Sequence, residues 1–154
     1  MYAQQGATVA EQYLIQTTNQ HRADHHLPPL TWDHTLAQAA HNHARVIAQN
    51  PGPALHQYPG EPDMKTRADQ AGAHFSTISE NVAGNATTAI EFDQAWMNSP
   101  VHRANILDPN LTAIGIAVVQ NHGVLDAVED FSRSVRVLSP SAVEQQAEQI
   151  IRDH

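Results

Sequence analysis

WMNSPVHRANIL, at residues 96–107, is the stretch of this sequence that constrains the fold most. A helix is predicted to lead into it, because Thr88-Ala89-Ile90-Glu91 fits a capping box and apolar residues then follow at helical spacing up to Trp96. Pro100 interrupts that helix, since proline lacks the amide that a helix interior needs. The stretch therefore predicts a helix, a break at the proline and a polar segment that carries His102.

Two more helices are predicted earlier in the chain. Thr8 and Glu11 fit a capping box for the first helix, which must end at Leu27-Pro28-Pro29. Asp33 is a suitable N-cap for the second helix, which stops at Asn50-Pro51-Gly52-Pro53. The second helix carries a helical stripe formed by Leu36, Ala40, His43, Ala44 and Ile47. We therefore expect the histidine of that stripe to be a packed, hydrogen-bonded core residue.

Residues 53–85 have the least regular pattern in the chain. Pro62-Asp63 favours the start of a short helix that closes at Ala71-Gly72. The rest of this region is predicted to be irregular, and a long irregular segment within a domain is more often functional than neutral.

A small antiparallel sheet is predicted near the C-terminal end. Residues 112–119 are apolar on both faces of a strand, which is typical of a sheet covered on both sides. Gln120-Asn121-His122-Gly123 is a hairpin signal, and residues 124–137 are expected to return antiparallel. The tail at residues 141–154 has the pattern of a modest helix. Together these elements predict an α+β fold, a three-layer αβα sandwich around a small, mostly antiparallel central sheet.

Composition excludes several classes of protein. The 154 residues contain no cysteine, which rules out disulfide scaffolds, cysteine zinc sites, thiolate catalysis and iron–sulfur clusters. The net charge of −8 argues against nucleic-acid binding, and no apolar run is long enough for a membrane span. Eleven histidines keep metal and acid–base chemistry open. No signal peptide follows Met1, so either the protein is cytosolic or its signal has been removed.

Several segments, in their order and spacing, resemble the CAP superfamily of cysteine-rich secretory proteins, antigen 5 and pathogenesis-related proteins, also called the SCP domain. They are Leu30-Thr31-Trp32-Asp33 with Leu36-Ala37-Gln38-Ala39-Ala40, then His56, Ser79-Glu80-Asn81-Val82-Ala83, residues 96–107 and Ile114-Gly115-Ile116. The resemblance implies a CAP domain over residues 8–137, between a flexible N-terminal segment, 1–7, and a C-terminal tail, 138–154. It also implies a bacterial, cysteine-free member that is secreted, extracellular or periplasmic.

The resemblance further implies a cleft lined by two histidines and two acidic residues. The matching positions are His56, Glu80 and His102, whereas Ser99 stands where the second acid is expected. In such a cleft His56 and His102 can hold a divalent metal, often zinc, and no organic cofactor is expected. Two imidazoles and one carboxylate also suit zinc chemically and leave a position for water or a ligand.

Three functions remain open for these residues. The preferred one is a secreted binding module for a small ligand, a lipid, a glycan, a divalent metal or an extracellular protein. The first alternative is a hydrolase in which a metal activates water and Glu80 is the general base. The second is a structural or interaction protein in which the cleft is a non-functional remnant and loops make the contacts. A catalytic triad of Ser99, His102 and Glu80 is disfavoured, because Ser99 precedes Pro100 and suits a helix end better.

Overall fold

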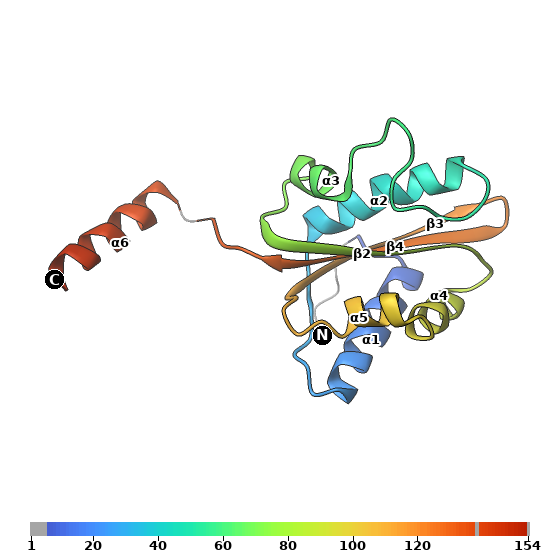
Figure 1. Cartoon of the computed structure of the whole chain (residues 1–154), viewed down its shortest axis with the longest axis horizontal. Helices are drawn as coiled ribbons and strands as arrows, with labels where there is room; N and C mark the ends of the chain where they lie inside the picture. Colours follow the sequence, from blue (N-terminus) through green and yellow to red (C-terminus); the bar gives the residue numbers. More distant parts are fainter. Residues whose placement is uncertain (1–5, 138, 154) are drawn as a thin grey trace.

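A four-stranded sheet forms the middle layer of the fold in the computed structural model, which describes residues 6–137 and 139–153 (Figure 1). The strands are β1 (Thr31–Trp32), β2 (Phe75–Ala86), β3 (Ala113–Asn121) and β4 (Val124–Ser134). Their order in the sheet is β1-β3-β4-β2, with β1 parallel to β3 and the other pairs antiparallel. Most of the predicted N-terminal segment, 1–7, lies outside the described residues.

Helices cover both faces of this sheet. They are α1 (Val9–Asp24), α2 (His34–Gln49), α3 (Met64–Gln70), α4 (Ala89–Met97), α5 (Pro100–Ile106) and α6 (Pro140–Arg152). Figure 1 shows α2 and α3 on one face and α1, α4 and α5 on the other, with α6 projecting away from the body. The predicted αβα sandwich is therefore confirmed. No helix of the described residues is long and apolar enough to cross a membrane.

The predicted helix starts are confirmed by their caps. Thr8 and Thr88 each form a capping box with the glutamate three residues later, and Asp33 accepts hydrogen bonds from the first turn of α2. Pro100 separates α4 from α5 as expected, with Ser99 as the N-cap residue of α5.

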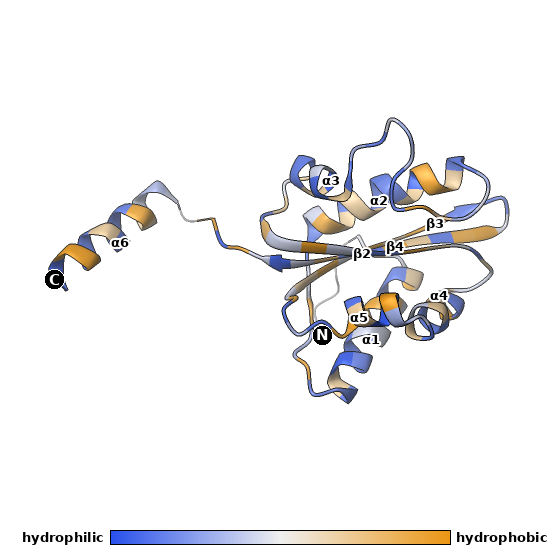
Figure 2. Ribbon diagram, in the orientation of Figure 1, coloured by the Kyte–Doolittle hydropathy of each residue, from blue (hydrophilic) through white to orange (hydrophobic). Residues whose placement is uncertain are grey.

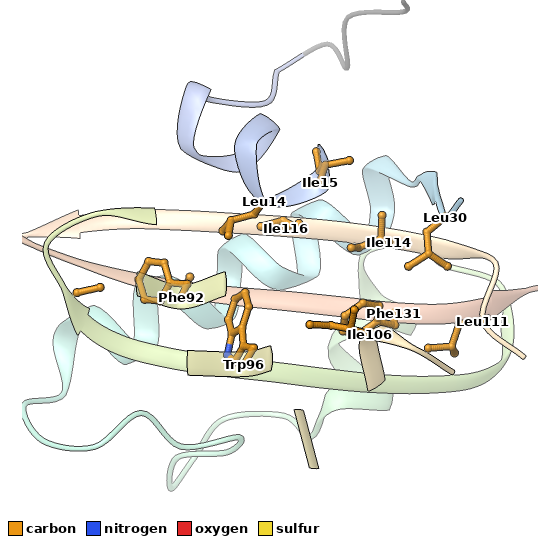
Figure 3. Close-up of a cluster of buried hydrophobic side chains, with 12 residues drawn as sticks. Leu14, Ile15, Leu30, Phe92, Trp96, Ile106, Leu111, Ile114, Ile116 and Phe131 are labelled. Carbon is orange, nitrogen blue, oxygen red and sulfur yellow. The ribbon is translucent and has the colours of Figure 1, made fainter. Parts of the chain in front are cut away.

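Apolar side chains fill both interfaces between sheet and helices. The larger cluster joins α1, α4 and α5 to the sheet, where Phe92 stacks on Trp96 and Phe131 is fully buried (Figure 3). Two smaller clusters lie between the sheet and α2 and α3. Figure 2 shows the hydropathy of each residue on the same view, with apolar stretches on the strands and both apolar and polar residues on the helices.

The prediction that residues 53–85 are mostly irregular is wrong over the last third of that region. Residues 75–86 form the edge strand β2, whereas the short helix predicted after Pro62-Asp63 is present as α3. The strand has no clear alternation of apolar and polar residues, because buried Glu80 and Asn81 interrupt it. These polar residues are buried because tertiary partners satisfy them, and the local pattern contains no information about those partners.

The hairpin between β3 and β4 is present and tight. Asn121 pairs with Val124, and the two residues between them, His122 and Gly123, both have positive φ angles. That combination defines a type I′ turn, whose twist matches the flanking strands. The strand bounds differ from the prediction by two or three residues, since β4 ends at Ser134 and not at residue 137.

Gly115 on β3 sets the distance between the sheet and α2. A Cβ atom at this position would lie 2.1 Å from the Ala37 nitrogen and 2.3 Å from the Leu36 carbonyl carbon. The obstacle is backbone and not a flexible side chain, so the helix itself would have to move. Because α2 carries His43 and borders the cleft, this glycine also determines how the site is assembled.

We predict that Gly115→Ala destabilises the fold by about 3 kcal/mol, the upper part of the range for overpacked cores. Gly60→Ala is the control, because a Cβ there meets nothing within 4 Å and only the positive φ opposes it. Its expected cost is about 1 kcal/mol. Urea unfolding of both variants measures the difference, and an equal loss in the two would contradict the close-approach explanation.

Candidate functional site

The candidate site is built around the edge strand β2, whose successive side chains point to opposite faces of the sheet. Glu80 points to the face of α2 and α3, where its carboxylate contacts Arg67 and His43. Asn81 points to the opposite face, where its amide donates to the carbonyl oxygen of His102 on α5, at 3.1 Å. The two faces of one strand thus connect to the two halves of the site.

Glu80 is a buried carboxylate with a cationic partner. Its Oε2 accepts a hydrogen bond from Arg67 Nη2 at 2.8 Å, and its Oε1 lies 3.1 Å from His56 Nδ1 and 3.7 Å from His43 Nε2. Burial opposes ionisation, but hydrogen bonds from His56 and Asp130 and the charges of Arg67 and His43 outweigh it and lower the pKa of Glu80. Glu80 is therefore ionised at neutral pH.

Asp130 is the opposite case, although it lies directly across from Glu80 in the β2–β4 register. Burial, together with the charge and hydrogen bond of Glu80, raises the pKa of Asp130 well above its ordinary value. The pair therefore holds one negative charge, on Glu80, and the protonated carboxyl of Asp130 donates to it.

His56 lies in the loop between α2 and α3, and its position depends on Arg67. The guanidinium Nη1 of Arg67 donates to the His56 carbonyl oxygen at 3.1 Å and to the Pro62 carbonyl oxygen at 3.0 Å. One arginine thus fixes both the loop and the carboxylate beneath it. The His56 side chain is 60% exposed, and its hydrogen bond to Glu80 raises its pKa despite partial burial.

His102 lies on α5, on the other side of the strand edge. Its Nδ1 lies 2.7 Å from Ser99 Oγ, and this contact replaces the cap hydrogen bond that Ser99 would otherwise make. Asn105 donates to Asn81 Oδ1 at 2.8 Å and so adds a second link between α5 and β2. Burial, and then the charge of His56, lower the pKa of His102, which is therefore neutral at pH 7.

The four residues predicted for the cleft form two separate pairs. His56 is bonded to Glu80, and His102 to Ser99. A Ser-His-acid triad is not assembled, since the acid is bonded to the other histidine and Ser99 meets the nitrogen that an acid would occupy in a triad. The effect of His56 on the His102 pKa links the two pairs electrostatically.

Sequence reasoning missed Arg67, Asp130 and Glu61, which surround Glu80 and His43. The prediction for His43 is confirmed, because it is fully buried, its Nδ1 meets Glu61 and its Nε2 meets the Leu55 carbonyl oxygen at 2.9 Å. The available signal was the single arginine in the short helix after Pro62-Asp63, because a buried carboxylate needs a cation.

Glu129 supports the α5 side of the site. It is fully buried on β4, accepts a hydrogen bond from Thr18 Oγ1 at 2.8 Å and lies 3.4 Å from Asn81 Nδ2. Burial raises its pKa to about 8, because these two neutral donors compensate it only in part. Glu129 is therefore protonated at neutral pH, in contrast to Glu80.

A groove of about 400 Å³ borders the His56 side of the site. Its lining residues are His56, Gln57, Asp63, Met64, Ile78, Ser79 and Glu80. Within the described part of the chain, no group of three or more His, Asp or Glu side chains is arranged to hold a metal. Of the two predicted metal ligands, His56 lines this groove and His102 is not among its lining residues.

The αβα fold is that of an SCP-type domain, and comparison with known proteins agrees. The model of the CAP family, described as the cysteine-rich secretory protein family, matches residues 15–131. The chain belongs to this family.

Two bacterial relatives are similar to this chain at the sequence level. The Bacillus subtilis protein YkwD is 32% identical over 114 residues, which cover 74% of this chain and 44% of that protein. The crystal structure of an extracellular protein containing an SCP domain, from Bacillus anthracis, has 28% identity and a TM-score of 0.74 over 80% of this chain and 40% of that one. The chain thus spans less than half the length of these two relatives.

An outer surface protein from Borrelia burgdorferi has the same fold at lower identity. Its TM-score is 0.75 with 20% sequence identity, over 82% of this chain and 93% of that one. The structural neighbours therefore include extracellular and outer-surface proteins of bacteria, and this chain itself has no cysteine, as expected of the bacterial type.

We predict that Glu129→Gln makes the protein more stable at pH 7.5 and changes little at pH 4. The folded chain holds this proton up to a pKa of about 8, whereas the unfolded chain releases it near 4.5. The contribution of Glu129 to the free energy of unfolding is therefore greatest below the unfolded-state pKa of 4.5. As pH rises from there toward the folded-state pKa of about 8, this contribution falls by up to about 1.4 kcal/mol per pH unit. Urea unfolding of both proteins from pH 4 to 8 measures the difference, which should widen with pH; a constant difference would contradict a protonated Glu129.

We predict that Arg67→Met costs about 3–5 kcal/mol, because it leaves the Glu80 carboxylate buried without its cation. The double variant Arg67→Met with Glu80→Gln should recover much of that loss, since the orphaned charge is gone. Guanidinium unfolding of the wild type, both single variants and the double variant gives the coupling free energy. Strictly additive losses would show that the two side chains do not stabilise each other.

Proposed function

We propose that this domain is an extracytoplasmic binding module that holds a divalent cation, such as zinc, through His56 and His102. A ligand bound in the cleft would complete the coordination of the cation. Residence outside the cytoplasm is part of the proposal and is supported by the extracellular and outer-surface proteins among its structural neighbours.

The observation that carries the proposal is the direction in which the two imidazoles are held. In each, Nδ1 has a partner, Glu80 Oε1 for His56 and Ser99 Oγ for His102. Within the described residues, no hydrogen bond engages either Nε2. A carboxylate, a carbonyl or a water on one ring nitrogen, with the other left to a metal, is the usual arrangement of metal-binding histidines, and the Ser99 hydroxyl takes that place at His102.

Ser99 makes this pair asymmetric. A carboxylate would raise the pKa of His102, whereas a hydroxyl leaves burial to lower it. Metal binding requires unprotonated nitrogen, so His102 binds a cation with little competition from protons at neutral pH. His56 has a raised pKa and is the histidine whose deprotonation governs metal affinity.

The hydrolase alternative has less support. A general base is most effective with a pKa near the working pH, whereas the pKa of Glu80 is lowered. Both of its oxygens already have partners, Arg67 on one and His56 on the other. The carboxylate is thus suited to orienting His56 and not to accepting a proton from water.

Zinc titration by calorimetry tests the proposal. We expect one site in the wild type and a loss of affinity of about 100-fold in His56→Ala and in His102→Ala. Affinity should rise with pH through the pKa of His56, because the proton there competes with the metal.

His41→Ala is the matched control, since His41 is a histidine of α2 that lines a different pocket, away from His56 and His102. Its zinc affinity should equal that of the wild type. The proposal fails if His56→Ala and His102→Ala bind zinc as tightly as this control does.

A further inference from the structure

The edge of β2 has hydrogen-bonding groups that face away from β4. In an antiparallel strand, the N–H and C=O groups of one residue point to the same side and alternate along the chain. The Glu80 carbonyl accepts from Asn105 Nδ2 at 3.3 Å, and the Val82 carbonyl accepts from Trp96 Nε1 at 3.2 Å. Even-numbered residues of this segment therefore face the outer edge.

Part of this edge is covered and part is open. Asn105 and Trp96 occupy the carbonyls of Glu80 and Val82. No partner among the described residues engages the N–H or C=O of Ile78 or the N–H of Glu80. The open segment is therefore Ile78 to Glu80, a strand edge with three unused ladder groups.

The groove beside His56 coincides with this open segment. Ile78, Ser79 and Glu80 all line it. The outward backbone groups of Ile78 and Glu80 lie at this edge, so a groove lined by both residues borders it. The groove is therefore positioned to admit an added strand.

The other edge of the sheet is covered in part. β1 pairs with β3 at Ala113 and Ile114. Further along the same edge, the amide of Val118 donates a hydrogen bond to the buried carboxylate of Glu11, at 2.9 Å. A short strand and a carboxylate thus cover parts of the β3 edge, whereas the unpaired part of the β2 edge lies beside His56.

We propose that the ligand of the cleft is an extended polypeptide segment that adds to β2 as a fifth strand at Ile78 and Glu80. This inference rests on the proposed function, because it names the ligand class of the same cleft. Such a strand would run along the groove beside His56.

The groove walls define which side chains suit this peptide. On the face of α3, Met64 offers apolar surface, and the neighbouring Asp63 is exposed and has a pKa lowered by its hydrogen bonds with Thr66. An apolar and a basic side chain two residues apart would both reach this wall, because alternate residues of a strand share a face. Backbone pairing supplies affinity in this mode, and the wall supplies selectivity.

The test uses the peptide acetyl-Thr-Leu-Thr-Lys-Thr-amide, which places its leucine and lysine on one face. Titration into the ¹⁵N-labelled whole chain should shift the amide signals of Ile78 and Glu80 and slow their hydrogen exchange. Two further peptides carry N-methyl groups on one or the other set of alternate amides. One set points at β2, so one of the two peptides should bind about tenfold more weakly and the other about as well as the parent.

A pair of protein variants gives an independent check. Ile78→Pro removes the outward amide without removing a bond to β4, and Ile78→Ala trims the same side chain but keeps that amide. The alanine variant should bind the peptide more tightly than the proline variant, with circular dichroism confirming that both are folded.

The outcomes separate this inference from the proposed function. Zinc binding at the histidines with no amide shift at millimolar peptide overturns the added strand alone, as does equal binding of the two methylated peptides. Loss of both zinc and peptide binding overturns the proposed function as well.

Discussion

The ion pair between Arg67 and Glu80 is the interaction on which the site depends. Removing a carboxylate from water costs far more than a typical hydrogen bond returns, so Glu80 can be ionised under α2 and α3 only beside a cation. The same guanidinium holds the His56 and Pro62 carbonyls, and therefore the loop across the site. Helix α3 is only seven residues long, and it places the Arg67 side chain beside Glu80.

The two buried glutamates on neighbouring strands show how the site concentrates its charge. Glu80 has an arginine partner and is ionised, whereas Glu129 is held by the neutral donors Thr18 and Asn81 and is protonated. Negative charge is therefore present on the His56 side and absent on the α5 side. The hydrogen bond to ionised Glu80 raises the pKa of His56, whereas burial and the charge of His56 lower the pKa of His102.

The helices were predictable because their signals are local: Thr8, Asp33 and Thr88 cap the helices they were expected to cap. The strand β2 was not, because its buried Glu80 and Asn81 are satisfied by partners far away in sequence. The same holds for Arg67, which is 13 residues from Glu80 in sequence, and for Asp130, which meets Glu80 only through strand pairing. Family resemblance identified the histidines, but the protonation of their neighbours follows from burial together with the charged and hydrogen-bonding partners that the fold brings to each carboxyl.

Ser99 changes the chemistry of the site without changing its arrangement. The hydroxyl meets His102 Nδ1, where the family pattern leads one to expect a carboxylate, and so the position keeps its orienting contact. What is lost is a negative charge, and with it a second group able to accept protons. Both oxygens of the Glu80 carboxylate already have partners, and the two imidazoles are held in fixed orientations, so the site is better suited to binding a ligand than to transferring protons. The unpaired edge of β2 beside it offers backbone groups to that ligand. Binding at this site therefore depends on geometry that the fold provides in advance, and not on a reactive acid–base pair.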